Sequence, residues 1–200
     1  MYKRICVTNR HLVTGDFFEQ IGHVINMKDS PDMLILREKD LTKEDYLELA
    51  RKVKELVFEM GNPPNGKESH NKTCLYLHNN IEAAKVLGIR NIHLSFGEFM
   101  KIKDLEIIRP FFDSIGTSVH SLEDIRLCNE AGFDYVFAGH IFETDCKKGL
   151  KGRGLDFLRE IVTEAKMPVY AIGGIKTSNE KLCIEAGAAG VCMMSAYMTL

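Results

Sequence analysis

The stretch EAGFDYVFAG (residues 130–139) shows the pattern on which the whole chain is built. A helical run ends at Glu130 and Ala131, Gly132 can take the positive φ of a tight helix exit, and residues 135–139 form an apolar strand. The same order returns in EAGAAGV (residues 185–191). Helices that turn through glycine directly into strands are typical of repeated α/β units. The sequence therefore predicts alternating strands and helices.

Working outward from this stretch, β-rich runs recur along the chain, and most are apolar, as strands buried on both faces should be. They cover residues 4–9, 33–37, 73–77, 91–94, 114–119, 135–139, 169–172 and 190–194. Stretches of helical period separate them, and Thr42 and Ser121 each precede early acids as helix N-caps do. Eight strands on this plan close into a barrel, whereas five or six would leave an open sheet.

The predicted fold class is α/β, a compact (β/α)8 TIM barrel formed by a single domain over residues 1–200. Only five residues follow Ser195, so the eighth outer helix is expected to be short or missing. Either the chain is truncated or another surface covers that flank, for example the second subunit of a homo-oligomer.

Composition excludes several classes of protein. The chain is 45% hydrophobic with a net charge of −2, which offers no broad basic surface for nucleic acid. No apolar run approaches the roughly 18 to 20 residues that span a bilayer, and the first residues contain no signal-peptide core. These features predict a cytoplasmic protein with no membrane partner.

The six cysteines form no CxxC pair and have no histidine at zinc-ligand spacing, so they are interpreted as reduced thiols. Cys6, Cys74 and Cys192 lie in apolar runs and are expected to be buried. Cys146 lies in a polar loop, where it is either an incidental thiol or a catalytic nucleophile.

In a barrel of this kind the active site lies where strands end. Gly173 and Gly174 follow the apolar run 169–172, and backbone N–H groups without side chains can approach a phosphate closely. Loops after the seventh and eighth strands are the frequent phosphate site of this fold, which adds Met194 and Ser195. The alternative is that the glycine pair only makes a turn.

Histidines supply the candidate acid–base groups. His140 follows the run 135–139, and an imidazole aimed into the barrel mouth is suited to moving protons near neutral pH. The alternative is a structural histidine with satisfied hydrogen bonds. His120 is a candidate orienting group, and His93 is a weaker candidate.

Two basic segments complete the candidate site. Arg37 and Lys39 follow the second strand and are suited to holding an anion, unless they belong to a solvated charge run. KKGLKGRG (residues 147–154) has the composition of a mobile lid over an anionic ligand, through Lys147, Lys148 and Arg153, although a soluble loop would look the same.

At these residues the sequence resembles the thiamine phosphate synthase superfamily. The generic resemblance lies in LREK (36–39), SVHS (118–121), AIGGI (171–175) and MSA (194–196). The specific one lies in GHIFETDCKKGLKGRG (139–154), which is similar to the TenI-type thiazole tautomerases.

The resemblance implies proton transfer on a carboxythiazole phosphate, without any cofactor or metal. His140 matches the family's catalytic position, Gly173, Gly174 and Ser195 would hold the phosphate, and Arg37 or Lys39 would steer the substrate carboxylate. The implied small-molecule ligand is a thiazole phosphate or thiamin phosphate.

Two other functions remain open. A thiamine phosphate synthase would condense thiazole phosphate with hydroxymethylpyrimidine diphosphate in the presence of magnesium. It typically has a Gln two residues before the strand-2 Arg, an Asn-Asp pair after strand 3 and Gly-Gln-x-Asp after strand 4. Here those places read Ile35, HNN (78–80) and SFGE (95–98), with Glu98 as a substitute for one carboxylate. The third function is a non-catalytic regulator that binds the ligand and acts through a partner protein.

Overall fold

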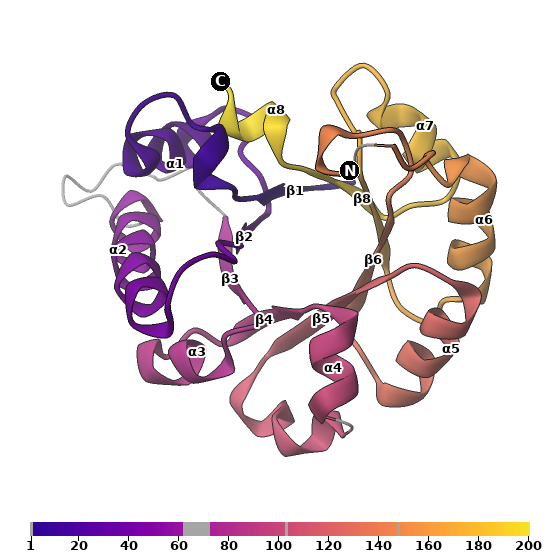
Figure 1. Ribbon diagram of the computed structural model, residues 1–200, viewed down its shortest axis with the longest axis horizontal. Helices are drawn as coiled ribbons and strands as arrows, with labels where there is room; N and C mark the ends of the chain where they lie inside the picture. Colours follow the sequence, from indigo (N-terminus) through magenta and orange to yellow (C-terminus); the bar gives the residue numbers. More distant parts are fainter. Residues whose placement is uncertain (1, 62–72, 103, 148) are drawn as a thin grey trace. The chain divides into compact units, whose positions relative to one another are not determined.

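The strand order of the computed structural model is β1 through β8 in sequence, all parallel and closed into a barrel, which confirms the predicted fold class (Figure 1). The structure describes residues 2–61, 73–102, 104–147 and 149–200. The strands are β1 (Lys3–Val7), β2 (Met33–Leu36), β3 (Cys74–His78), β4 (Asn91–Leu94), β5 (Ser114–Val119), β6 (Tyr135–Gly139), β7 (Val169–Ile172) and β8 (Gly190–Met193). Every predicted strand is present, with ends that differ by at most two residues.

Helices follow the strands in turn. They are α1 (Phe17–Asn26), α2 (Lys43–Gly61), α3 (Ile81–Leu87), α4 (Phe96–Ile102), α5 (Leu122–Ala131), α6 (Gly154–Glu164), α7 (Glu180–Glu185) and α8 (Ser195–Met198), with short 3-10 turns η1 (Arg10–Leu12), η2 (Leu105–Ile107), η3 (Arg109–Phe111) and η4 (Asp145–Lys147). The last helix has only 4 residues, so the prediction of a short eighth helix is confirmed.

Local sequence sets the helix ends where it was expected to do so. The Thr42 hydroxyl accepts a hydrogen bond from the Asp45 amide (3.1 Å) before α2. The Ser121 hydroxyl accepts one from the Asp124 amide (3.0 Å) before α5. Gly132 ends α5 with φ 75°, in the left-handed region. These caps supply partners for backbone groups that a helix end would otherwise leave unpaired.

The chain forms two compact units. The first contains His93–Met193 together with Lys3, and is called the 93–193 unit below; the second contains Arg4–Ile92 and Met194–Leu200, and is called the 4–92 unit. The assignment of residues 1–200 to a single domain stays a prediction.

The 93–193 unit is built on β5 to β8. Register pairs Val119 with Ala138 and Gly139 with Ile172, so the residues that follow β6 and β7 are neighbours. Its interior holds an aromatic cluster in which the rings of His93 and Phe137 stack with centroids 4.1 Å apart. Helices α5 and α6 lie side by side on its outside (Figure 1).

The 4–92 unit is built on β1 to β3. Leu36 pairs with Leu77 at the ends of β2 and β3, and Leu34 and Ile35 are fully buried. Helices α1 and α2 pack against each other (Figure 1). The predicted burial of Cys6 and Cys192 is confirmed, but that of Cys74 is wrong. Cys74 is the first residue of β3 and lies before the strand becomes enclosed.

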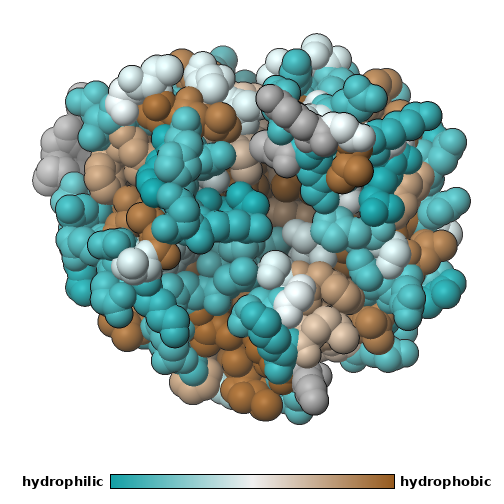
Figure 2. Space-filling model, in the orientation of Figure 1, coloured by the Kyte–Doolittle hydropathy of each residue, from teal (hydrophilic) through white to brown (hydrophobic). Residues whose placement is uncertain are grey.

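The visible surface is largely hydrophilic, with hydrophobic side chains scattered between (Figure 2). Phe58, Val86 and Ile107 are the most exposed large apolar side chains of the described residues. Scattered exposed apolar residues of this kind are normal for a protein surface. No helix within the described ranges combines the length and apolarity needed to cross a bilayer.

Candidate active site

His140 directly follows β6 and is 7% exposed. Its Nε2 lies 3.4 Å from the Leu150 carbonyl oxygen, and because a carbonyl can only accept, this contact places the ring proton on Nε2. The other nitrogen, Nδ1, is buried and has no hydrogen-bond partner among the described residues. In the neutral tautomer with its proton on Nε2, Nδ1 carries a lone pair that can accept a proton; that role for His140 stays a prediction.

His120 follows β5, and its ring is fixed beside His140. Its Nδ1 donates to the carbonyl oxygen of Gly139 (2.9 Å), the residue before His140. Its backbone amide donates to the Asp124 carboxylate (2.7 Å), which holds the start of α5 against the same turn. The structure thus ties His120 to the residue that precedes His140, and in a neutral ring that donates through Nδ1 the acceptor nitrogen is Nε2.

Gly173 and Gly174 follow β7 with φ of 100° and 65°. A Cβ at Gly173 would lie 2.3 Å from the Cβ of His140, and one at Gly174 would lie 2.4 Å from the Glu143 carbonyl oxygen. The Phe142 amide donates to the Gly173 carbonyl (3.0 Å). The missing side chains let the segment carrying His140 lie directly on the end of β7. Sequence reasoning assigned these glycines to a phosphate, and that contact stays a prediction.

The predicted lid is tied to the site at its end. The Arg153 amide donates to the His140 carbonyl (3.0 Å), and the Arg153 guanidinium lies over the Phe157 ring at 5.1 Å. Lys147 ends η4 and is exposed, while Lys148 lies outside the described residues. Movement of this segment as a lid stays a prediction.

His93 makes a buried network that sequence reasoning underrated. Its Nε2 lies 2.9 Å from the Ser118 hydroxyl, and its Nδ1 lies 3.2 Å from the Tyr135 hydroxyl. The signal was present, because a histidine inside an apolar strand needs buried partners. This network links β4, β5 and β6 in the interior of the 93–193 unit.

In the 4–92 unit, Leu36 pairs with Leu77, which brings the predicted cation Arg37 next to His78 at the end of β3; the second cation, Lys39, is exposed. Burial first, and then the positive charges of Arg37 and Lys39, lower the pKa of His78 to about 3. His78 is therefore a neutral imidazole at pH 7. Nothing in the sequence singled it out, because only the pairing of β2 with β3 brings it to the two cations.

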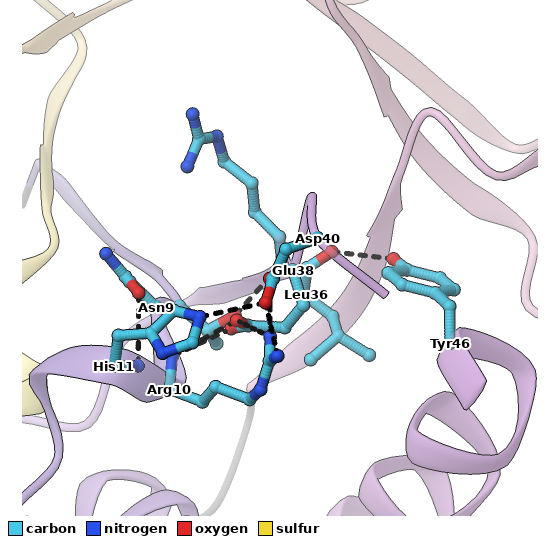
Figure 3. A network of polar contacts seen from close by, with 9 residues as sticks. Asn9, Arg10, His11, Leu36, Glu38, Asp40 and Tyr46 are labelled. Carbon is cyan, nitrogen blue, oxygen red and sulfur yellow. Dashed lines mark hydrogen bonds and ion pairs between the residues drawn. The ribbon is translucent and has the colours of Figure 1, made fainter. Parts of the chain in front are cut away.

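Glu38 lies between those cations in the sequence but belongs to a separate charge network (Figure 3). Its carboxylate accepts hydrogen bonds from the Thr8 hydroxyl (2.6 Å), the Arg10 amide (3.1 Å) and the Arg10 guanidinium (3.2 Å). The same guanidinium donates to Asp40 (2.6 Å), whose other partner is His11 (2.9 Å). Hydrogen bonds from Arg10 and then His11 hold the pKa of Asp40 well below its usual range.

The remaining sequence candidates lie at the start of α8. Met194 is its N-cap residue, and Ser195 is its first residue and is exposed. Both belong to the 4–92 unit, and their contact with a phosphate stays a prediction.

Asn80 and Glu98 stand where the synthase pattern has metal-binding groups, and both side chains make local contacts. The Asn80 side chain accepts from the Ala83 amide (3.0 Å) as the N-cap of α3, and the Glu98 carboxylate accepts from Lys101 (3.0 Å). Within the described ranges, no three His, Cys, Asp or Glu side chains are grouped as metal ligands would be.

A closed parallel barrel with a buried imidazole and a glycine pair at neighbouring strand ends belongs to the barrel enzymes, whose active sites lie at those ends. Within that class, the chain belongs to the thiamine monophosphate synthase family, whose model matches residues 5–197.

Individual relatives cover nearly the whole chain. A thiamine-phosphate synthase of Desulfitobacterium hafniense is 32% identical over 201 residues, which cover 99% of this chain and 90% of that protein. A putative thiamine-phosphate synthase 2 of Aquifex aeolicus is 27% identical and covers 96% and 95%, respectively. The solved structure of a thiamine phosphate pyrophosphorylase from Pyrococcus furiosus matches with a TM-score of 0.77 and 24% identity, covering 100% of this chain and 88% of that one. This last likeness supports the barrel fold.

Proposed function

We propose that this protein is an enzyme of thiamin biosynthesis that aromatises a carboxythiazole phosphate by proton transfer. The observation that carries the proposal is the imidazole of His140, which is buried at the end of β6 and has no protein partner at Nδ1 among the described residues. A buried polar atom without a partner costs about 1–3 kcal/mol, so its retention points to a ligand atom as the partner.

The reaction requires two proton movements and no oxidant. Nδ1 of His140 removes the proton from ring C2, and the electrons of that C–H bond enter the ring as the exocyclic double bond shifts inward. The resulting imidazolium returns the proton to the exocyclic carbon, which becomes saturated. One imidazole performs both steps in turn, which is general base and then general acid catalysis.

The two anionic groups of the substrate, the phosphate and the carboxylate, each need their own binding groups. The phosphate is assigned to the backbone of Gly173 and Gly174, with Met194 and Ser195 as the other sequence-based candidates. The carboxylate is assigned to Arg37 and Lys39, which carry positive charge beside a neutral His78.

A second candidate is thiamine phosphate synthase activity, because the relatives described above carry that name. Against it, Asn80 and Glu98 stand at positions where the synthase pattern has its metal-binding groups, and both side chains are engaged locally.

One pair of assays separates the candidates. The purified protein is incubated with the non-aromatic thiazole tautomer, and in parallel with thiazole phosphate, hydroxymethylpyrimidine diphosphate and magnesium. We expect aromatisation in the first assay and at most trace condensation in the second. Condensation at an ordinary enzymatic rate of roughly 1 to 10³ per second would overturn the proposal. Ligand binding with no turnover in either assay would indicate a regulator instead.

A further inference from the structure

The segment Arg37-Glu38-Lys39, after β2, carries charges of both signs, and the structure separates them. Glu38 is buried, with a side chain 1% exposed, and contacts Thr8 and Arg10. Arg37 and Lys39 act electrostatically on His78, at the end of β3. The side chain of Glu38 and the backbone amide of Arg37 both contact the Thr8 hydroxyl, so the position of Glu38 is coupled to that of the residue before it.

The burial of Glu38 is stabilised by a complete set of donors. Both carboxylate oxygens accept from the Arg10 amide at 3.1 Å, one accepts from the Thr8 hydroxyl at 2.6 Å, and the other accepts from the Arg10 guanidinium at 3.2 Å (Figure 3). A buried carboxylate is tolerated only with such donors, and removing them is strongly destabilising.

Thr8 connects this anchor to the backbone of Arg37. Its hydroxyl proton is donated to Glu38, which leaves the oxygen lone pairs to accept from the Arg37 amide at 2.9 Å. A second link runs through Tyr46, whose hydroxyl donates to the Leu36 carbonyl (2.7 Å) and accepts from the His78 amide (3.1 Å). The end of β2 is therefore held on one side by Glu38 and on the other by Tyr46.

We infer that Glu38 is a positioning residue: its buried carboxylate fastens the segment after β2 to Thr8 and Arg10 and thereby orients Arg37 and Lys39 to bind an anionic group. This inference rests on the proposed function only for the identity of that group, the carboxylate of the substrate. The role assigned to Glu38 and to the charge network of Figure 3 is to position the two cations, whereas binding of the anion itself is left to Arg37 and Lys39.

The test compares Glu38→Gln with Asp40→Asn. Each variant removes one negative charge from a partner of the same Arg10 guanidinium, but Asp40 is half-exposed and lies beyond the anchor. The reporter is the imidazole of His78, followed by NMR from pH 8 down to about pH 3, as far as the protein stays folded, and assigned with a His78→Gln variant.

The sign of the change separates positioning from simple charge loss. Removing a nearby negative charge would lower the pKa of His78 further. Release of Arg37 and Lys39 from His78 would raise the pKa, because two positive charges move away, although burial still holds it below the usual value. We expect Glu38→Gln to raise the pKa of His78 above its wild-type value, and Asp40→Asn to leave it unchanged or lower it.

Binding of inorganic pyrophosphate, measured by calorimetry, provides the functional readout. We expect Glu38→Gln to weaken this binding by about tenfold, the effect of losing one charge-assisted contact, as Arg37→Gln does, and Asp40→Asn to change it less than twofold. If Glu38→Gln does not fold, Thr8→Val replaces it, since it keeps the side-chain shape and removes the hydroxyl that joins Glu38 to Arg37.

A folded Glu38→Gln or Thr8→Val protein in which the pKa of His78 is not raised and the pyrophosphate affinity is that of the wild type would overturn the inference. Pyrophosphate binding that is indifferent to Arg37→Gln would overturn the anion-binding role. Neither readout involves turnover, so a negative tautomerase assay beside positive results here would refute the proposed function and leave the positioning role intact.

Discussion

The end of β6 and the end of β2 are built on opposite plans. After β6, His140 is buried with Nδ1 unpartnered among the described residues, and it lies on the bare backbone of Gly173. After β2, the buried Glu38 has a donor for each oxygen. In the functions proposed for them, the group that exchanges a proton is left without a partner among the described residues, whereas the group that only holds others in place is saturated with hydrogen bonds.

The largest effect should come from removing the reactive imidazole after β6. We expect His140→Gln to slow aromatisation by about 10² to 10⁴-fold, or roughly 3 to 5 kcal/mol of barrier, because an amide cannot accept and return a proton. The rate is measured at saturating substrate, with deuterium exchange at C2 in parallel and a thermal melt to check folding. A folded variant that keeps a third of the wild-type rate would transfer the role to His120 or Cys146.

The next prediction concerns Gly173, against which His140 packs. Gly173→Ala should lower the free energy of unfolding by about 3 kcal/mol, since the new Cβ would meet His140 and the backbone has positive φ. Gly97→Ala is the matched control: it has open space around it in α4 and should be neutral or stabilising by about 0.5–1 kcal/mol. Both values come from urea unfolding. Equal effects in the two variants would show that Gly173 is not needed for packing.

Near the end of β2, the low pKa of His78 predicts that the free energy of unfolding depends on pH. Its folded-state pKa, about 3, lies below the usual 6.5, so the unfolded chain binds more protons between these values. Stability is therefore full above about pH 6.5 and falls as the pH drops toward 3, by about 2 kcal/mol between pH 7.5 and 5. We expect His78→Gln to remove about this part of the slope in urea unfolding. An unchanged slope would mean that His78 is not buried beside the two cations.

The smallest expected effect concerns the buried His93 in the 93–193 unit. It tests whether the hydrogen bonds of a buried side chain stabilise this unit, as we infer for Glu38 after β2. Tyr135→Phe removes the hydroxyl beside Nδ1 of His93 and should lower the free energy of unfolding by about 1 kcal/mol. Ser118→Ala removes the partner on the other side of the same ring and serves as the comparison variant. No loss in either variant would show that the His93 network contributes nothing to stability.

The fold followed from sequence because its signals are local. The strand over residues 114–119 lies between turn residues, and Ser121 and Gly132 mark the ends of the following helix by capping chemistry. Apolar runs buried on both faces have the same composition wherever they occur, so counting them was enough to reach the barrel. The first residue of β3 was misjudged, because Cys74 lies in an apolar run but outside the enclosed part of the strand.

For the candidate site, the sequence by itself determined which residues follow strands: His140 after β6, His120 after β5, the glycine pair after β7, and Arg37 and Lys39 after β2. Only the tertiary structure decided their surroundings. It left Nδ1 of His140 without a partner among the described residues, fixed His120 on the Gly139 carbonyl, and joined Glu38 to Thr8 and Arg10. By pairing β2 with β3 it also brought His78 within electrostatic range of two cations about forty positions away in the chain. The physical reason is that strand position depends on local pattern, whereas hydrogen-bond partners and burial depend on which distant segments pair, and pairing is a property of the whole chain.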